Sequence, residues 1–212
     1  TLPTCRDRAE GRAPPAFLIF LALMTSVIAL TIDAVLPSLD AISAELGFAA
    51  ANDRHLLVLL VFAGMGLSQL VFGTLSDQIG RKPAALAGWL VYLAGTLTCL
   101  AATTPVMIFA GRFLQGLGAG GPRIVAMAVV RDLYEGRAMA RILSLVLTIF
   151  MIVPICAPLI GQGIAALAGW RAIFGLYLAL ALVSGGWYLL GVPETLHPRH
   201  RRPAGLAPVL GA

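Results

Sequence analysis

Six long apolar runs constrain the fold of this chain more than any other feature of its sequence. They span residues 15–36, 55–75, 84–103, 105–130, 139–167 and 170–192. A helix needs about 20 apolar residues to cross a hydrocarbon core about 30 Å thick, and each run is long enough. The runs are continuously apolar, whereas the strands of a membrane barrel alternate over about ten residues. Since only helices and closed barrels satisfy the backbone in lipid, we expect an all-α integral membrane protein with six transmembrane helices.

The composition agrees with a membrane protein and argues against other classes. Charged residues make up 12% of the chain, and the mean hydropathy is +0.90. Soluble domains carry about a quarter charged residues. The net charge of +5 would also suit a nucleic-acid-binding protein, but the basic residues lie in short clusters between the apolar runs. That distribution is typical of membrane topology, so we expect no nucleic-acid partner.

The basic residues also predict the orientation in the membrane. With the N-terminus inside, eleven Lys and Arg residues fall in cytoplasmic segments, and only Arg54 and Arg171 fall in outer loops. The positive-inside rule therefore places both termini in the cytoplasm. The chain then divides into a cytoplasmic N-terminal segment (residues 1–14), a transmembrane domain (residues 15–192) and a cytoplasmic tail (residues 193–212).

A charged segment with the sequence GTLSDQIGRKP, residues 73–83, separates the second apolar run from the third. Gly73 allows another backbone to approach closely, and Gly80 allows a tight turn. Asp77 can cap or pair locally, and Arg81 and Lys82 hold the loop inside. Any short inner loop carries basic residues, so these two alone indicate no function.

The whole string, however, resembles the signature loop of the major facilitator superfamily, approximately G-x-L-[AS]-D-x-x-G-R-[KR]-P. The resemblance implies a gating loop, made by Gly73, Asp77, Gly80, Arg81 and Lys82, that latches two halves of a transporter together on the cytoplasmic side.

The fourth run contains a charge about two turns inside an apolar helix. Placing the charge of Arg112 inside a membrane span is costly, so we take Arg112 as a candidate functional residue. The alternative is an arginine that snorkels to the outer interface. Gln115 follows on nearly the same face, and Gly116 and Gly120 form a pair that permits close helix packing. The string resembles the superfamily's fourth-helix motif R-x-x-x-G-x-G-A, in which the arginine is associated with proton coupling.

Two further charges lie inside the runs. Arg123 follows Pro122 in the cytoplasmic half of the fourth run and matches no motif; it either lines a cavity or snorkels inward. Asp33 is the only acidic residue within the predicted spans, near the outer end of the first. Because Arg112 is expected at a similar depth, an ion pair between the two would lower the cost of burying both. We interpret Asp33 as a proton site whose contact with Arg112 is exchanged when substrate or a proton binds. The alternative is an interfacial aspartate without a role.

The strings TIDAVLPSL, RDLYEGRAMARILS and GWRAIF resemble the Bcr/CflA-like drug:proton antiporter branch of the superfamily. The fifth run resembles the antiporter motif G-x-x-x-G-P-x-x-G-G, although only Pro158 and Gly161 match it. Prolines Pro154 and Pro158 interrupt helical hydrogen bonds, and Gly161 and Gly163 allow tight contact. A kinked packing helix is the plainer interpretation of the same residues.

Other chemistry is not indicated by the sequence. It contains no nucleotide-binding G-x-x-x-x-G-K-[ST] loop, and its three histidines do not form a metal cluster. We therefore expect neither an enzyme nor a cofactor or metal site.

The resemblance covers residues 15–195 and implies one half of a twelve-helix fold, built from two inverted three-helix repeats with the substrate between the halves. The predicted function is the N-terminal half of a secondary transporter in the bacterial inner membrane that exports drugs or small metabolites against protons by alternating access. Its partners would be a small-molecule substrate, protons, the bilayer, and a C-terminal half or a second copy. The alternatives are a truncated or non-transporting six-helix membrane protein and an uptake carrier. Asp33 favours cationic or neutral substrates, while Arg112 and Arg123 leave anions open.

Overall fold

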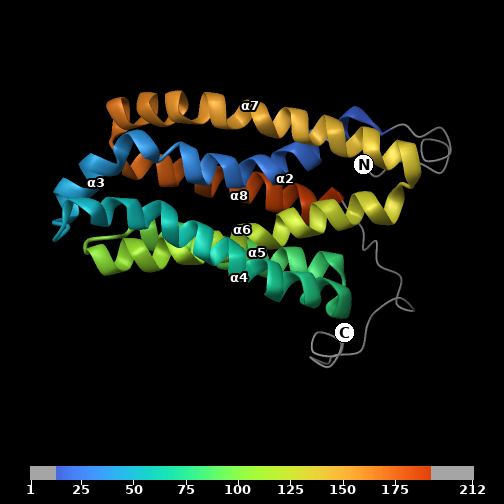
Figure 1. Cartoon of the computed structure of the whole chain (residues 1–212), viewed down its shortest axis with the longest axis horizontal. Coiled ribbons are helices and arrows are strands. Elements are labelled where there is room, and N and C mark those ends of the chain that lie inside the picture. Colours follow the sequence, from blue (N-terminus) through green and yellow to red (C-terminus); the bar gives the residue numbers. More distant parts are fainter. Residues whose placement is uncertain (1–12, 192–212) are drawn as a thin grey trace.

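The computed structural model describes residues 13–191, which form a bundle of six long helices and three short helical segments (Figure 1). The long helices are α2 (Pro15–Asp33), α4 (Leu56–Ile79), α5 (Arg81–Leu100), α6 (Pro105–Leu133), α7 (Gly136–Ala168) and α8 (Arg171–Gly191). The short segments are η1 (Leu36–Ser38), α3 (Leu39–Leu46) and η2 (Ala51–His55). Each of the six long helices is long and apolar enough to cross a membrane, which confirms the predicted all-α membrane fold.

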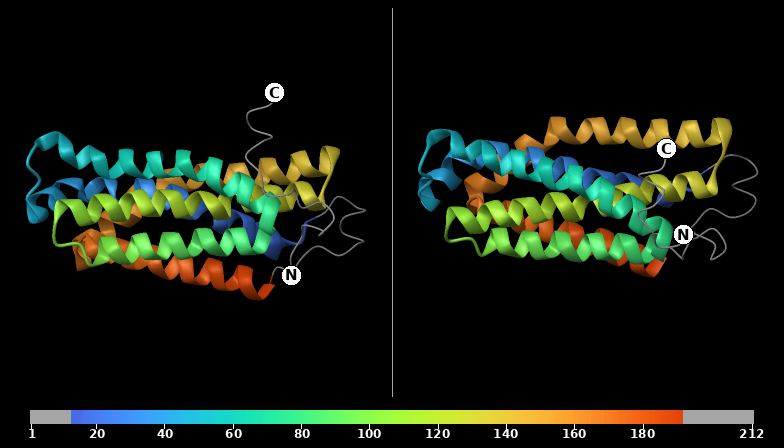
Figure 2. Two further views of the ribbon diagram at one scale, coloured as in Figure 1. Left: turned by 90° about the horizontal axis from the view of Figure 1, so that it is seen from below. Right: turned by 60° about the horizontal axis from the view of Figure 1, so that its bottom comes forward.

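The helices run back and forth between two ends of the bundle (Figures 1 and 2). One end, here called the Arg81 end, holds the start of α2, the α4–α5 and α6–α7 connections and the end of α8. The opposite end, here called the Trp170 end, holds α3 and the α5–α6 and α7–α8 connections. The alternation agrees with six consecutive crossings. Which end faces the cytoplasm stays a prediction.

α6 is the central helix of the bundle and packs most extensively against α5 and α4. Its glycines allow these close approaches on two sides. A Cβ at Gly116 would overlap the carbonyl of Val61 in α4, and one at Gly118 would overlap the backbone of Tyr92 in α5. Gly120 faces the side chain of Ser68 on α4 with equally little space. The predicted packing role of Gly116 and Gly120 is therefore visible in the bundle.

The charged segment at residues 73–83 is not the loop that the sequence suggested. α4 continues to Ile79 and α5 begins at Arg81, so Gly80 alone connects the two helices. Its backbone angles, φ 107° and ψ 164°, belong to a region that essentially only glycine adopts, which explains the glycine here. The expectation that Gly73 allows close backbone approach is wrong, because a Cβ at this position would meet no atom within 4 Å.

The prolines and glycines of the fifth span have separate effects. Pro154 and Pro158 lie inside α7, which remains a continuous helix from Gly136 to Ala168. Gly161 packs against the backbone of Ala34, directly after α2, as close contact requires. Gly163 faces open space, so its predicted packing role is wrong.

The first span also ends earlier than expected. α2 stops at Asp33, because Pro37 has no N–H to donate to the carbonyl four residues before it. The predicted N-terminal segment falls almost entirely, and the predicted tail wholly, outside the described residues.

Candidate functional site

Arg112 lies in α6, near the Trp170 end, and its side chain is fully buried. Its guanidinium donates three hydrogen bonds of 2.9 Å: from Nε to the carbonyl of Leu57 in α4, from Nη2 to the carbonyl of Thr31 in α2, and from Nη1 to Oε1 of Gln115. Phe174 of α8 lies 5.9 Å from the guanidinium carbon, within range of a cation–π contact. Because the side chain is buried, the alternative of an arginine that snorkels to the interface is wrong.

Gln115 and a row of hydroxyl groups extend these contacts into α5. Gln115 donates from Nε2 to Oγ1 of Thr96 at 2.9 Å, and Thr96 donates to the carbonyl of Tyr92 at 2.8 Å. Thr31 Oγ1 lies 2.6 Å from the carbonyl of Val27 and 2.7 Å from the Tyr92 hydroxyl. Since Thr31 has one proton to donate to the carbonyl, the Tyr92 hydroxyl donates to Thr31. We call these residues of α2, α4, α5 and α6 the Arg112 network.

The contact with Thr31 places the charge at a favourable point of α2. The last carbonyls of a helix have no helical partner and form the negative end of its dipole. Arg112 therefore satisfies a carbonyl in the last turn of α2 and interacts favourably with the helix end. This accounts for a buried cation in the membrane without a carboxylate partner.

Asp33 does not form the predicted ion pair with Arg112. The two residues lie near the same end of the bundle, since Arg112 bonds the carbonyl of Thr31, two residues before Asp33. Asp33 is half-buried, and among the described residues its carboxylate makes no ion pair or side-chain hydrogen bond. The predicted ion pair is wrong because the guanidinium donates its hydrogen bonds to two backbone carbonyls and to Gln115 instead. The sequence does not mark backbone carbonyls as ligands.

A second charged group joins three helices at the Arg81 end. Arg81, the first residue of α5, donates to Asp77 of α4 at 2.7 Å and to Asp132 of α6 at 3.2 Å. It also donates to the hydroxyl of Ser76 at 2.9 Å. We call these four residues the Arg81 cluster. The single-residue connection at Gly80 holds Asp77 and Arg81 four residues apart on either side of the turn, which makes the pairing possible.

Lys82 lies apart from this cluster, although the sequence grouped the two basic residues. Its ammonium donates to the carbonyl of Leu189 in the last turns of α8 at 2.7 Å. A cation near a helix C-terminus satisfies carbonyls that lack helical partners. Lys82 thus fastens the end of α8 to the start of α5.

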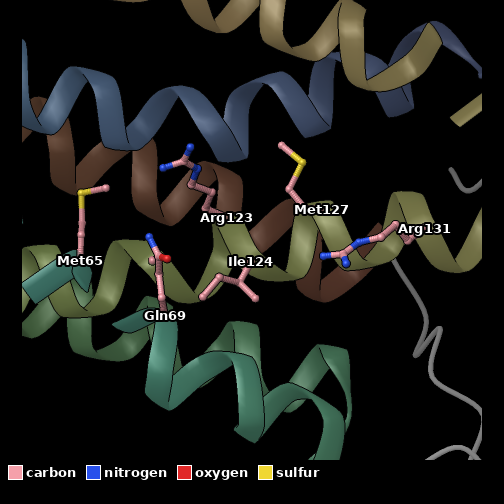
Figure 3. Close-up of a pocket in the computed structure, with 7 residues that line it drawn as sticks. Met65, Gln69, Arg123, Ile124, Met127 and Arg131 are labelled. Carbon is pink, nitrogen blue, oxygen red and sulfur yellow. The ribbon is translucent and has the colours of Figure 1, made fainter. Parts of the chain in front are cut away.

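Arg123 lines a cavity of about 350 Å³ between α4 and α6 (Figure 3). Its other lining residues are Met65, Gln69, Gly120, Ile124, Met127 and Arg131. A smaller recess between α2, α6 and α7 shares Arg123 and Met127. An adjoining cavity of about 300 Å³ shares Ile124 and Arg131 and is lined by the Arg81 cluster. Of the two alternatives for Arg123, the structure supports the cavity-lining residue.

Comparisons with known proteins agree with this architecture. The profile of the Major Facilitator Superfamily matches residues 19–211. The chain belongs to this superfamily. It is therefore a membrane transporter family member and not an enzyme, and the transporter resemblance drawn from its motifs is confirmed.

Curated relatives of the chain include several multidrug resistance proteins. The chain is 38% identical over 177 residues to the multidrug resistance protein MdtL of Salmonella paratyphi B, and 37% identical to MdtL of Salmonella typhimurium. Each match covers 84% of this chain and 43% of the relative. The chain thus spans less than half the length of these superfamily relatives.

The sequence marked about half of the polar residues that the structure brings together. It identified Arg112, Gln115, Asp77 and Arg81, and Ser76 is part of the matched signature string, but it missed Thr31, Tyr92, Thr96 and Asp132. Tyr92 and Thr96 stand four residues apart in an apolar run, a spacing that puts them on one helix face and could have indicated a polar contact. Asp132 stands next to Arg131 in the RDLY string quoted for the resemblance. The carbonyls of Thr31 and Leu57 carry no signal in the sequence.

Proposed function

We propose that these six helices form one half of a proton-coupled exporter of drugs or small metabolites that works by alternating access. The observation that carries the proposal is a pair of adjoining cavities, lined in part by charged residues, in an apolar bundle. The cavity around Arg123 and the cavity at the Arg81 cluster adjoin along α6, from about its middle to its end. A membrane protein with a purely structural role has no need of such cavities, since charged residues within a membrane span are costly.

The Arg81 cluster is a suitable gate for these cavities. It joins α4, α5 and α6 at the point where the second cavity reaches the Arg81 end. In the proposed cycle this end faces the cytoplasm, as the distribution of basic residues predicts. Reorganisation of the Arg81 contacts with Asp77 and Asp132 would then accompany opening. Lys82, bonded to α8, would hold the helix ends together during that movement.

A second six-helix half is part of the proposal. α7 is the least enclosed long helix: only 17% of its most apolar stretch is buried, against 67% for α6. Its exposed apolar residues, together with those of α4, offer surface for a second half as well as for lipid. The second half would be a further part of the polypeptide or a second copy of the chain. The length of the MdtL relatives supports this proposal, since the chain covers 43% of them.

Asp33 is the proposed proton site. Its half-buried carboxylate has no ion-pair partner among the described residues, and it lies close in sequence to Thr31 of the Arg112 network. A carboxylate without a fixed cation can gain and lose a proton at lower cost than one held in an ion pair. Proton binding would be transmitted to α6 through the end of α2.

A chimaera tests the proposal directly. The chain replaces the matched part of MdtL from Salmonella typhimurium, and everted vesicles from cells that lack their own exporters are given a proton gradient. We expect gradient-dependent accumulation of antibiotics by the vesicles, and its loss in the Asp33→Asn variant but not in the exposed Asp40→Asn control. A chimaera that inserts and folds but moves nothing would favour a non-transporting membrane protein. Movement in the opposite direction would favour an uptake carrier, and transport unchanged in Asp33→Asn would refute the proton site.

A further inference from the structure

Arg123 is a charged residue within the membrane span that the gate and the Arg112 network do not use. It precedes the end of α6 by ten residues, or about 15 Å of helix, and so lies well inside the span. A charge at that depth is costly and normally faces a partner or a polar cavity. Its contact in the structure is the ring of Phe150 in α7, 5.7 Å from the guanidinium carbon.

Four other arginines of the described part of the chain have polar acceptors. Arg112 is held by two carbonyls and an amide oxygen, and Arg81 by two carboxylates. Arg54 and Arg171 each pair with a carboxylate, Asp40 and Glu45 respectively. Among the described residues, the guanidinium of Arg123 makes no ion pair or hydrogen bond, so its N–H donors are available to a ligand.

The cavity around Arg123 has the charge of an anion site. Its lining includes a second guanidinium, that of Arg131, and no carboxylate. In Figure 3 the Gln69 amide points from α4 toward Arg123, and the Arg131 side chain extends along the cavity from the next turns of α6. The two arginines are eight residues apart, which corresponds to about 12 Å along the helix. An anion entering from the Arg81 end would therefore meet Arg131 before Arg123.

The remaining surface of the cavity is apolar and adaptable. Met65, Ile124 and Met127 supply it, and methionine side chains adjust to ligands of different shape. A volume of about 350 Å³ is within the range of small-molecule sites. Two cationic groups beside an apolar wall complement a molecule with an apolar body and an oxyanion group.

We propose that this cavity binds the oxyanion group, a carboxylate or a phosphate, of an amphiphilic molecule, with Arg123 as the principal ligand and Arg131 and Gln69 as further contacts. The inference deepens the proposed function, on which it rests, by naming the substrate class. Arg112 donates its three hydrogen bonds elsewhere, and neither Arg112 nor Asp33 lines the cavity. The charge that faces a ligand here is therefore positive, whereas the sequence, through Asp33, favoured cationic or neutral substrates.

Binding to the purified chain tests the inference without requiring transport. The chain is reconstituted in phosphatidylcholine nanodiscs, and the affinities of naphthoate and its neutral analogue naphthamide are measured against empty nanodiscs. We expect naphthoate to bind at least about tenfold more tightly, a difference of about 1.4 kcal/mol. Arg123→Gln should remove this preference and leave naphthamide binding unchanged. The matched control, Arg137→Gln, changes an exposed arginine of α7 that lines neither cavity and should have no effect.

Two further arms keep the test decisive. Arg123→Lys retains the charge but not the planar fork, so it should keep part of the preference for naphthoate even if Arg123→Gln folds poorly. Phosphatidylglycerol nanodiscs distinguish the source of the oxyanion: competition with naphthoate identifies a lipid phosphate as an occupant, and no competition identifies a soluble anion. Equal affinities for naphthoate and naphthamide, or full naphthoate binding by a folded Arg123→Gln chain, would overturn the inference. Anion binding by a chain whose MdtL chimaera does not transport would refute the proposed function alone.

Discussion

Replacement of Arg112 by methionine should destabilise the bundle far more than the same change at an exposed arginine. Methionine is similar in length but cannot donate a hydrogen bond. The substitution leaves the carbonyl of Thr31 and Oε1 of Gln115 without the donor that now lies 2.9 Å away. Both acceptors belong to the buried interior between α2, α5 and α6, where water does not replace the lost donor. The third acceptor, the carbonyl of Leu57, lies in the first turn of α4 and keeps its helical N–H partner.

The magnitude follows from the number of acceptors left behind. A buried acceptor without a donor costs about 1–3 kcal/mol, so two cost about 2–6 kcal/mol. Removal of the guanidinium also removes the cost of burying its charge, which offsets part of this loss. We therefore expect Arg112→Met to lower the free energy of unfolding by about 2–4 kcal/mol. The control, Arg54→Met, breaks a pair with Asp40 whose side chains are 39% and 81% exposed, and should cost about 0–1 kcal/mol.

Cys99 provides the assay. Its side chain is fully buried, and its Sγ lies 3.8 Å from Oε1 of Gln115, so a thiol-reactive dye reaches it only when the network opens. In a background with Cys5 and Cys156 replaced by serine, labelling is followed during SDS titration in mixed micelles. Arg112→Met should move the midpoint to lower SDS, well beyond the shift of Arg54→Met. Equal midpoints for the two variants would refute the reasoning that the Arg112 network holds the helices together.

Three further predictions concern packing, backbone geometry and surface charge, and the same titration measures them. Gly116→Val should lower the free energy of unfolding by at least about 1–3 kcal/mol, since the valine side chain would overlap a backbone carbonyl of α4. Gly66→Val, at a position that faces open space, is the control, and equal losses would contradict the packing argument. Gly80→Ala should lower the free energy of unfolding by about 1–3 kcal/mol, because φ 107° is strained for alanine. Gly73→Ala should have no cost or should stabilise the helix. A neutral Gly80→Ala would show that the turn adapts. Glu45→Gln should lower the SDS midpoint only slightly, because the carboxylate pairs with an arginine at a half-exposed site, and the shift should shrink as salt screens the pair. A large shift that is independent of salt would contradict this expectation.

Features with a local cause in the sequence were predicted well. The six spans follow from runs of apolar residues, because a bilayer of fixed thickness imposes the length of each helix. The role of Gly116 and Gly120 follows from their spacing of four, which puts both on one side of α6. The same reasoning failed for Gly73 and Gly163, since spacing alone does not say whether a neighbouring helix lies on that side of the glycine.

Features that depend on contacts between distant segments were not predictable to the same degree. The sequence predicts Asp33 as the partner of Arg112, because the two residues have opposite charges and are expected at a similar depth. The structure instead supplies carbonyl oxygens of Thr31 and Leu57, 81 and 55 residues away in the sequence. Every residue has a carbonyl, so residue types cannot indicate such a ligand. The separation of Arg81 from Lys82 likewise depends on where α6 and α8 end in space.

The arrangement of small residues around α6 also determines where this protein can change. Gly116 and Gly118 are fixed by the helices that touch them, so substitutions at these positions disturb the fold. The stripe that includes Arg123, Ile124 and Met127 borders the cavity instead and has room for other side chains. Ligand preference and stability are therefore encoded in different stretches of one helix, with the tightly packed glycines toward the Trp170 end and the cavity toward the Arg81 end. A library restricted to this stripe should yield well-folded proteins with new ligand preferences, obtained without redesign of the bundle.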